Sequence, residues 1–187
     1  MSKVFVITGP SGVGKGTLIA ELLQRVPNLE LSVSATTREP RGGERDGRDY
    51  HFLGAEEFDR RAREQEFLEH ATYSGNRYGT LRDEVERRLR AGQSVVLEIE
   101  VQGARQVRAA MPDSVQVFIA PLTPDVLRER LQGRGTDSPP QIDERLRTAE
   151  QELAAQEEFG YVVVNDDLER AAGELERIVR AELEGDP

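Results

Sequence analysis

The sequence contains no cysteine, and only two of its 187 residues, Lys3 and Lys15, are lysine. The absence of cysteine excludes a disulfide framework, a cysteine nucleophile and a zinc site built on thiolates. No apolar run approaches the length of a membrane-spanning helix, and the first apolar stretch, residues 4–7, is too short for a signal peptide. These absences predict a cytoplasmic protein that makes no membrane contact.

Basic residues are also in the minority. The chain has 25 Lys and Arg residues against 35 Asp and Glu residues, which gives a net charge of −10. Such a charge disfavours general binding to nucleic acids or anionic membranes, so an anionic ligand must be met by a local basic site. The length predicts one domain, residues 1–187, whose core needs no metal or disulfide. No obligatory protein partner is evident.

Short runs rich in β-branched residues alternate with helical patterns along the chain. Near-continuous apolarity over so few residues is typical of parallel strands that are covered on both faces. Four such runs and a fifth, more alternating one predict strands at residues 4–7, 94–97, 115–119, 161–164 and 29–34. The alternation predicts an α/β fold in which a parallel β-sheet core is flanked by helices.

Capping residues indicate where several helices begin. The Ser, Thr, Asp and Pro residues that are typical of helix starts lie at residues 123–124, 138–141 and 166–169. We expect the helix that begins after Ser138 to run as far as Phe159. Its mixture of acidic and basic residues, over 143–158, predicts a solvated helix face.

Residues 35–54 interrupt the alternation of strands and helices. The segment is rich in glycine and arginine and is too long for a plain connection in a compact domain. Aromatic residues lie in it and after it, namely Tyr50, Phe52, Phe58, Phe67, Tyr73 and Tyr78. They predict a small hydrophobic centre of their own, and therefore an arm attached to the main sheet.

A phosphate-binding motif follows the first predicted strand. It reads Gly9-Pro10-Ser11-Gly12-Val13-Gly14-Lys15-Gly16-Thr17, here called the phosphate loop. This is the G-x-x-x-x-G-K pattern in the strand-to-helix context that it requires. Its glycines let backbone N–H groups turn toward an anion, and Lys15 reaches the outer phosphates. Gly16 stands where Ser or Thr is usual, so Mg²⁺ would be held through Thr17, through water or by acidic residues elsewhere.

The phosphate loop alone does not name a reaction. A signalling GTPase needs an N-K-x-D motif to read its base, and neither lysine of this chain is available for one. The motifs of the arm are more informative, because residues 36–52 read T-x-R-x-x-R-x-x-E-x-x-G-x-x-Y-x-F. Further matching segments lie at residues 75–80, 97–103, 134–138 and 164–166.

Over essentially the whole chain these motifs resemble guanylate kinases, the nucleoside monophosphate kinases that transfer the γ-phosphoryl group of ATP to GMP. The resemblance implies a P-loop kinase with a small mixed GMP-binding arm at residues 34–83 and a helical lid at residues 130–147. It also implies Mg²⁺, bound with ATP, as the cofactor. It leaves open whether dGMP is an acceptor as well.

Residue chemistry supports the same assignment on the acceptor side. Arginine forks and tyrosine hydroxyls suit a phosphate dianion. By the resemblance, the residues that hold the GMP phosphate are Arg38, Arg41, Tyr50 and Tyr78. Guanine presents two adjacent donors that one carboxylate can accept, and Glu69 is at the family's position for this contact. The hydroxyls of Ser34 and Thr80 are expected to add bonds to the base.

Acidic residues follow a predicted strand at the edge where parallel strands face a ligand. Glu98 is a candidate for holding Mg²⁺ through water and Glu100 for binding GMP, although either could take the other role. The resemblance implies that Arg134 and Arg145 stabilise the transferred phosphoryl group, by the charge neutralisation that such transfers need. Further ATP-binding residues implied by the resemblance are Arg130, Asn165 and Asp166.

Two other interpretations fit parts of the pattern. The family has non-catalytic relatives, scaffold domains that bind protein partners in the arm cleft, but their phosphate loop is degraded and this one is intact. A kinase for another small molecule would keep the loop and differ in the base pocket, where Glu69 discriminates. His51 and His70 are interpreted as structural, because phosphoryl transfer requires no histidine base.

Overall fold

The computed structural model describes residues 1–73, 75–133 and 139–185. Its core is a five-stranded parallel sheet in the order β2-β7-β1-β8-β9. The strands are β1 (Val4–Thr8), β2 (Leu29–Leu31), β7 (Ser94–Glu98), β8 (Val115–Pro121) and β9 (Tyr161–Asn165). The predicted parallel core flanked by helices is confirmed. The strand predicted at 29–34 is wrong in length, because the chain leaves the sheet after Leu31 for the arm.

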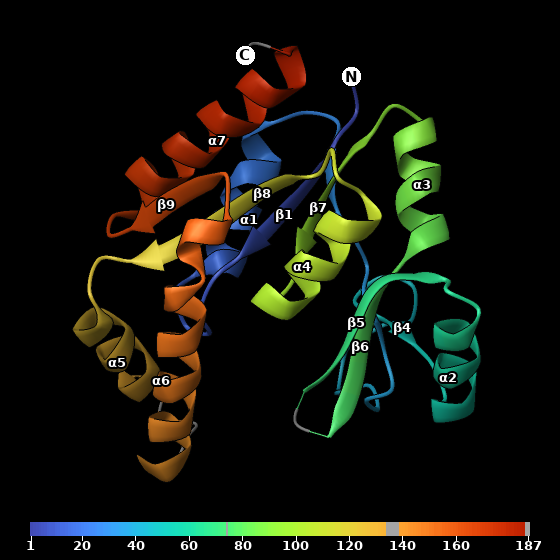
Figure 1. The fold of residues 1–187 in the computed structure, drawn as a ribbon, viewed down its shortest axis with the longest axis horizontal. Helices are drawn as coiled ribbons and strands as arrows, with labels where there is room; N and C mark the ends of the chain where they lie inside the picture. Colours follow the sequence, from blue (N-terminus) through green and yellow to red (C-terminus); the bar gives the residue numbers. More distant parts are fainter. Residues whose placement is uncertain (74, 134–138, 186–187) are drawn as a thin grey trace.

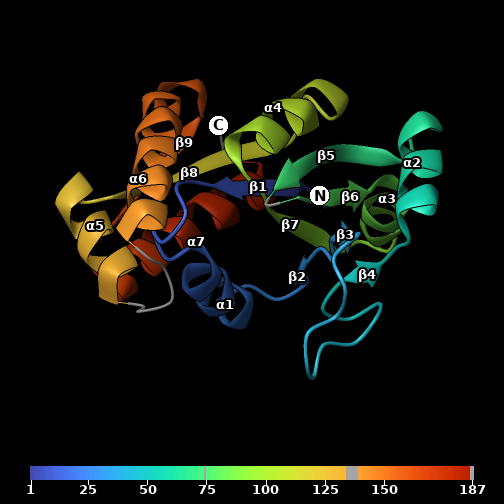
Figure 2. The ribbon, with the colours of Figure 1, turned by 90° about the horizontal axis from the view of Figure 1, so that it is seen from below.

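Helices cover both faces of the sheet, which explains why its strands are apolar throughout. On one face lie α1 (Lys15–Arg25) and α7 (Leu168–Glu184), which pack on β1 and β8 through Leu18, Leu22 and Leu175. On the other face lies α4 (Val101–Ala110), through Val101 and Val107. Figure 2 shows α4 on one side of the strands and α1 with α7 on the other. Both helix layers therefore bury the sheet and leave its strand ends for function.

A second sheet lies within the predicted arm. Its order is β4-β3-β6-β5, with β3 and β4 parallel and the other pairs antiparallel. The elements are β3 (Ala35–Thr36), β4 (His51–Phe52), α2 (Ala55–Arg63), β5 (Phe67–Tyr73), β6 (Asn76–Leu81) and α3 (Arg82–Arg90). In Figure 1 this sheet and α2 lie to one side of the core, opposite α5 and α6.

The arm has a hydrophobic centre of its own, though smaller than the sequence predicts. Phe58 stacks on Phe67 with ring centroids 4.5 Å apart, and Ala35 and Leu81 complete the buried cluster. The tyrosines among the predicted aromatics lie outside it, and Tyr73 is 48% exposed. The aromatic residues of the arm therefore divide between packing and a more open, polar face.

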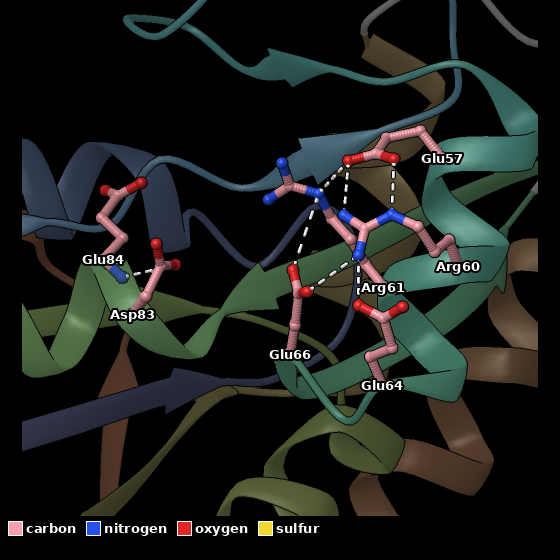
Figure 3. A network of polar contacts seen from close by, with 7 residues as sticks. All are labelled: Glu57, Arg60, Arg61, Glu64, Glu66, Asp83 and Glu84. Atoms are coloured by element: carbon pink, nitrogen blue, oxygen red, sulfur yellow. Dashed lines mark hydrogen bonds and ion pairs between the residues drawn. The ribbon is translucent and has the colours of Figure 1, made fainter.

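Helix α2 carries a network of charged side chains on its surface. Arg60 and Arg61 bind Glu57, and Arg60 also contacts Glu64 and Glu66 (Figure 3). All five side chains are at least a quarter exposed, so solvent and salt screen these ion pairs and they add little to the stability of the fold. The network fits a solvated helix face.

Helices α5 (Pro124–Gly133) and α6 (Pro139–Ala154) pack together through Leu127 and Leu146, and they extend beyond both ends of the predicted lid, residues 130–147. Thr123 caps α5, since its hydroxyl oxygen accepts the backbone N–H of Val126 at 3.3 Å. The prediction of one helix as far as Phe159 is wrong. Helix α6 ends at Ala154, and a 3-10 turn, Gln156–Glu158, carries Phe159 into the core. Among the described residues, no helix combines the length and apolarity that crossing a membrane requires.

Candidate active site

The phosphate loop joins the carboxyl end of β1 to the start of α1, as the motif requires. Gly9 and Gly14 have φ angles of 141° and 101°, a region in which glycine is favoured. A Cβ atom on Gly9 would lie 2.2 Å from the carbonyl oxygen of Ile119, and one on Gly14 would lie 2.6 Å from the side-chain nitrogen of Asn165. Both positions therefore require glycine, because β8 and β9 closely support the loop.

Lys15 lies at the first position of α1 and turns back over the loop. Its Nζ donates to the carbonyl oxygen of Gly9 at 2.6 Å and lies 3.3 Å from that of Pro10. The ammonium group is thus held beside the N-terminus of a helix, where the backbone N–H groups favour an anion. This arrangement places a cation at the position where the outer phosphates of a nucleotide would bind.

The other end of the loop is fixed by residues from the lid and from β9. The Val13 carbonyl oxygen accepts Asn165 Nδ2 at 2.7 Å and Arg130 Nη1 at 2.9 Å. Arg130 also donates through Nη2 to the carbonyl oxygen of Asn165 at 3.1 Å. Gly14, Thr17, Arg130 and Asn165 line a cavity of about 340 Å³. Sequence reasoning assigns Arg130 and Asn165 to ATP, and the structure brings both to this cavity.

Arg145 connects α6 to the phosphate loop. Its Nη2 donates to Ser11 Oγ at 2.7 Å. Asp166, by contrast, is engaged at the start of α7, where it pairs with Arg170. The predicted Arg134 lies outside the described residues. Three arginines are predicted for the donor side, and two of them, Arg130 and Arg145, lie within the described residues. Both contact the phosphate loop.

Glu69 is a buried carboxylate in β5, 6% exposed. A register shift between Phe67 and Glu69 places it opposite Thr80 of β6, whose hydroxyl donates to Glu69 Oε1 at 2.7 Å. Gly103 of α4 leaves room for the carboxylate, because a Cβ atom there would lie 2.7 Å from Oε2. Burial raises the pKa of Glu69 to about 7, the hydrogen bonds from Thr80 oppose that rise, and the charge of Glu100 adds to it.

One continuous region of the surface links these groups. A cavity of about 490 Å³ is lined by residues that include Ser11, Lys15, Ser34, Tyr50, Thr80, Glu98 and Glu100. A neighbouring cavity of about 300 Å³ shares Ser34, Tyr50, Glu98 and Glu100 with it and adds Glu69 and Tyr78. The region thus extends from the phosphate loop to the buried carboxylate of the arm.

Of the predicted phosphate-binding residues of the arm, Tyr50 and Tyr78 line this region, whereas Arg38 and Arg41 are not among its lining residues. Arg38 Nη2 binds both oxygens of Glu44, at 2.8 and 3.0 Å, and its guanidinium lies 5.3 Å from the centre of the Tyr50 ring. Tyr50 and Tyr78 meet edge to face, with centroids 6.2 Å apart. Arg41 is exposed, and its backbone N–H donates to the same Glu44 at 2.7 Å. Glu44 therefore holds the loop that carries both arginines.

Comparison with known proteins assigns the chain to a family. The family model for guanylate kinase matches residues 1–182. The chain belongs to the guanylate kinase family. A guanylate kinase of Rubrobacter xylanophilus is 53% identical over 183 residues, 98% of this chain and 96% of the relative. One of Synechocystis sp. is 52% identical over 180 residues, 96% of this chain and 94% of the relative.

Solved structures agree with the sequence comparison. The crystal structure of guanylate kinase from Anaplasma phagocytophilum matches with a TM-score of 0.77 and 36% identity, and the match covers 97% of this chain and 86% of that one. Both comparisons therefore extend over the core, the arm and the lid. As a member of the guanylate kinase family, the chain is a nucleoside monophosphate kinase by class.

Within this guanylate kinase fold the surroundings of Gly16 fit a magnesium ion. A Cβ atom on Gly16 would lie 3.9 Å from both carboxylate oxygens of Glu98, so the carboxylate of β7 faces the start of α1. Among the described residues, no group of three or more His, Cys, Asp or Glu side chains is arranged so that it could hold a metal ion by itself. One carboxylate together with substrate phosphates and water is the donor set that Mg²⁺ commonly takes. Glu98 suits that role, and Thr17 is next to Gly16 in the chain.

Sequence reasoning missed Glu152 of α6. The prediction of a solvated face over 143–158 is wrong at this residue, which is half-buried and lines the larger cavity with Lys15. Burial raises the pKa of Glu152 to about 7, and the charge of Glu100 adds to the rise, while Lys15 and the Ser11 N–H oppose it. The one available signal was helical spacing, since Arg145 and Glu152 are seven residues apart and so share a helix face.

Proposed function

We propose that this chain transfers the γ-phosphoryl group of ATP to GMP and so produces ADP and GDP. The observation that carries the proposal is the continuous region between Lys15 in the phosphate loop and the buried carboxylate of Glu69. A phosphate cradle at one end and a paired acceptor for N–H groups at the other suit two nucleotides that meet between them. A cytoplasmic location accompanies the proposal, because the reaction consumes ATP.

On the donor side, the phosphates of ATP would bind the backbone N–H groups of the phosphate loop and Lys15. The cavity lined by Thr17, Arg130 and Asn165 would take the adenosine. Arg145, which already contacts Ser11, would bind the γ-phosphoryl oxygens, and Arg134 is proposed for the same task. Asp166 remains a proposed contact of the adenine.

On the acceptor side, the guanine N1–H and amino group would donate to Glu69, with Ser34 and Thr80 beside the base. The GMP phosphate would bind Arg38, Arg41, Tyr50 and Tyr78. Arg38 is paired with Glu44 in the structure, so the phosphate would take over part of that interaction. Glu100 lines both cavities and would bind the acceptor nucleotide.

The transfer itself needs little from the protein beyond placement and charge. A phosphate oxygen of GMP forms a bond to the γ-phosphorus of ATP while the bond to the β–γ bridging oxygen breaks, and ADP leaves. Glu98 and Thr17 would hold Mg²⁺, which would supply neutralisation of phosphate charge when bound. Lys15 and the arginines of the lid stabilise the equatorial oxygens of the phosphoryl group during its transfer. We further propose that arm and lid close over the substrates and exclude water.

A coupled assay of ADP release tests the proposal. ATP and Mg²⁺ are offered with GMP, dGMP, AMP, CMP or UMP in parallel, at equal concentrations. Turnover is expected with GMP and not with AMP, CMP or UMP, and the result with dGMP decides whether a deoxyribose acceptor is also used. Turnover with another base would keep the kinase and remove the role of Glu69, whereas measurable GMP binding without turnover would support a scaffold function.

The pKa of Glu69 predicts how the reaction depends on pH. Guanine needs the ionised carboxylate, so GMP must displace a proton when the pH is below about 7. We expect kcat/KM for GMP, which reports groups of the free enzyme, to fall by about tenfold between pH 8 and pH 6. The Glu69→Gln variant keeps the titration of the GMP phosphate and of Glu152 but lacks this contribution. Equal slopes in the two proteins would show that Glu69 does not titrate in this range.

A further inference from the structure

Glu84, in the first turn of α3, is a buried carboxylate at the base of the arm. It is 4% exposed, and the proposed reaction does not use it. Its Oε1 accepts the backbone N–H of Val33 at 3.2 Å and lies 2.8 Å from Arg88 Nη2. Its Oε2 lies 2.5 Å from His51 Nε2. Figure 3 shows Glu84 apart from the α2 network.

These contacts hold the backbone on both sides of Ser34. Val33 immediately precedes Ser34, and the Ser34 carbonyl oxygen accepts the backbone N–H of His51 at 2.9 Å. One oxygen of Glu84 therefore binds the residue before Ser34, and the other binds the residue that is hydrogen-bonded to Ser34. Ser34 in turn lines both cavities of the candidate site.

Arg88 anchors the same carboxylate to the core. Its Nη1 donates to the Leu31 carbonyl oxygen at 2.8 Å and lies 3.1 Å from Glu30 Oε2, so it connects α3 to β2. A buried carboxylate is costly unless charge and hydrogen bonds compensate it. Arg88, His51 and the Val33 N–H supply that compensation. The short segment between β2 and β3 is thereby tied to both the core and the arm.

We propose that Glu84 is a positioning residue that holds Ser34 in place for the guanine base. This inference rests on the proposed function, in which the Ser34 hydroxyl bonds the base. A pocket that is formed before its ligand arrives avoids part of the ordering cost of binding. Glu84 therefore acts on the affinity for GMP, and not on the affinity for ATP or on kcat at saturating GMP.

The Glu84→Gln variant tests this role. The substitution keeps the size of the side chain but removes its charge and one of its two acceptor oxygens. Because about one hydrogen bond to the base is weakened, we expect the Kd for GMP to rise by about three- to tenfold. Isothermal titration calorimetry gives this Kd without ATP. In the coupled assay KM for GMP should rise in parallel, with kcat and KM for ATP unchanged. An unchanged Kd for GMP would overturn the proposal.

A double-mutant cycle with Ser34→Ala separates positioning from general loosening. If Glu84 acts through Ser34, the Kd of the double variant equals that of Ser34→Ala alone, and additive losses would contradict this. Val179→Ala, in the buried cluster of α1 and α7, is the stability control. It should lower the melting temperature and leave the Kd for GMP unchanged, and a rise in Kd would count against a specific role of Glu84.

A second variant covers the case in which Glu84→Gln does not fold. His51→Ala removes the contact to Oε2 alone, at a side chain that is 29% exposed. It should also raise the Kd for GMP, by a smaller factor, and an unchanged Kd would overturn the proposal. Failure of the proposed function has a different signature, because it appears in the unsubstituted chain, which would then not turn over GMP in the coupled assay.

Discussion

Replacing Lys15 with methionine is expected to lower kcat by about 10³-fold or more, the range for removing a preorganised charge from a transition state. The Lys15 ammonium is fixed beside the loop by the Gly9 carbonyl, so it needs little rearrangement to meet the outer phosphates. Methionine fills a similar volume without the charge. GMP binding should remain, because all the proposed acceptor residues except Glu100 lie on the arm. Steady-state kinetics and calorimetry with GMP measure the two effects.

The chain offers a matched control, because Lys3 is its only other lysine. Lys3 pairs with Glu182 of α7 at 2.5 Å, remote from the phosphate loop. Lys3→Met removes the same group and should leave kcat unchanged. A loss in both variants would point to general electrostatics, and activity retained in Lys15→Met would remove Lys15 from the mechanism.

Replacing Glu69 with glutamine is expected to lower kcat/KM for GMP by about 10²- to 10⁴-fold, as for sites built to pair with donors of a substrate. Guanine presents two N–H donors, whereas the glutamine side chain offers only one acceptor oxygen beside its NH₂ group. One N–H donor of guanine would therefore face the NH₂ group. Thr80 can still donate to the amide oxygen, which preserves the local structure. Kinetics with varied GMP and saturating ATP measure the loss, and KM for ATP should be unchanged.

Glu66 supplies the control for this variant. It lies in the same arm and pairs with Arg60 at 3.1 Å (Figure 3), but it is not among the residues that line the two cavities. Glu66→Gln should leave the kinetics unchanged. A folding defect in Glu69→Gln is also not expected, because the amide avoids burying a charge above pH 7. At pH 8 the variant should melt at a higher temperature than the unsubstituted chain, and a lower one would attribute the kinetic loss to misfolding.

The main sheet could be predicted from the sequence because its strands are short apolar runs, such as residues 4–7, that lie within strands of the structure. The arm was harder. Its strands β3 and β4 are two residues long. Strand β3 pairs with β6, more than 40 positions later in the chain, and β4 pairs in turn with β3. The local sequence pattern does not predict such strands, because tertiary contacts between distant parts of the chain form them.

The candidate site divides in the same way. Lys15 and Arg38 lie in motifs whose spacing is fixed by a turn of the backbone, so they can be assigned from sequence. Glu84 and Glu152 resemble any other acid on a charged helix. They are distinguished by their surroundings. Glu84 is buried against Val33, and Glu152 is half-buried in the cavity that Lys15 also lines. Such burial depends on how α3 and α6 pack, and a one-dimensional pattern of charges does not contain that information.

Because of the register shift in β5, the number of residues in this strand is as important for the guanine pocket as the identity of those residues. Leu68 is the extra residue between the pairs Phe67–Leu81 and Glu69–Thr80, and it packs into the main core. Alternate residues of a strand point to opposite faces, so deleting or inserting a single residue here would turn Glu69 out of the pocket. Insertions and deletions at residues 67–69 should therefore be far less tolerated than substitutions at Leu68, even though they leave every other side chain of the pocket intact.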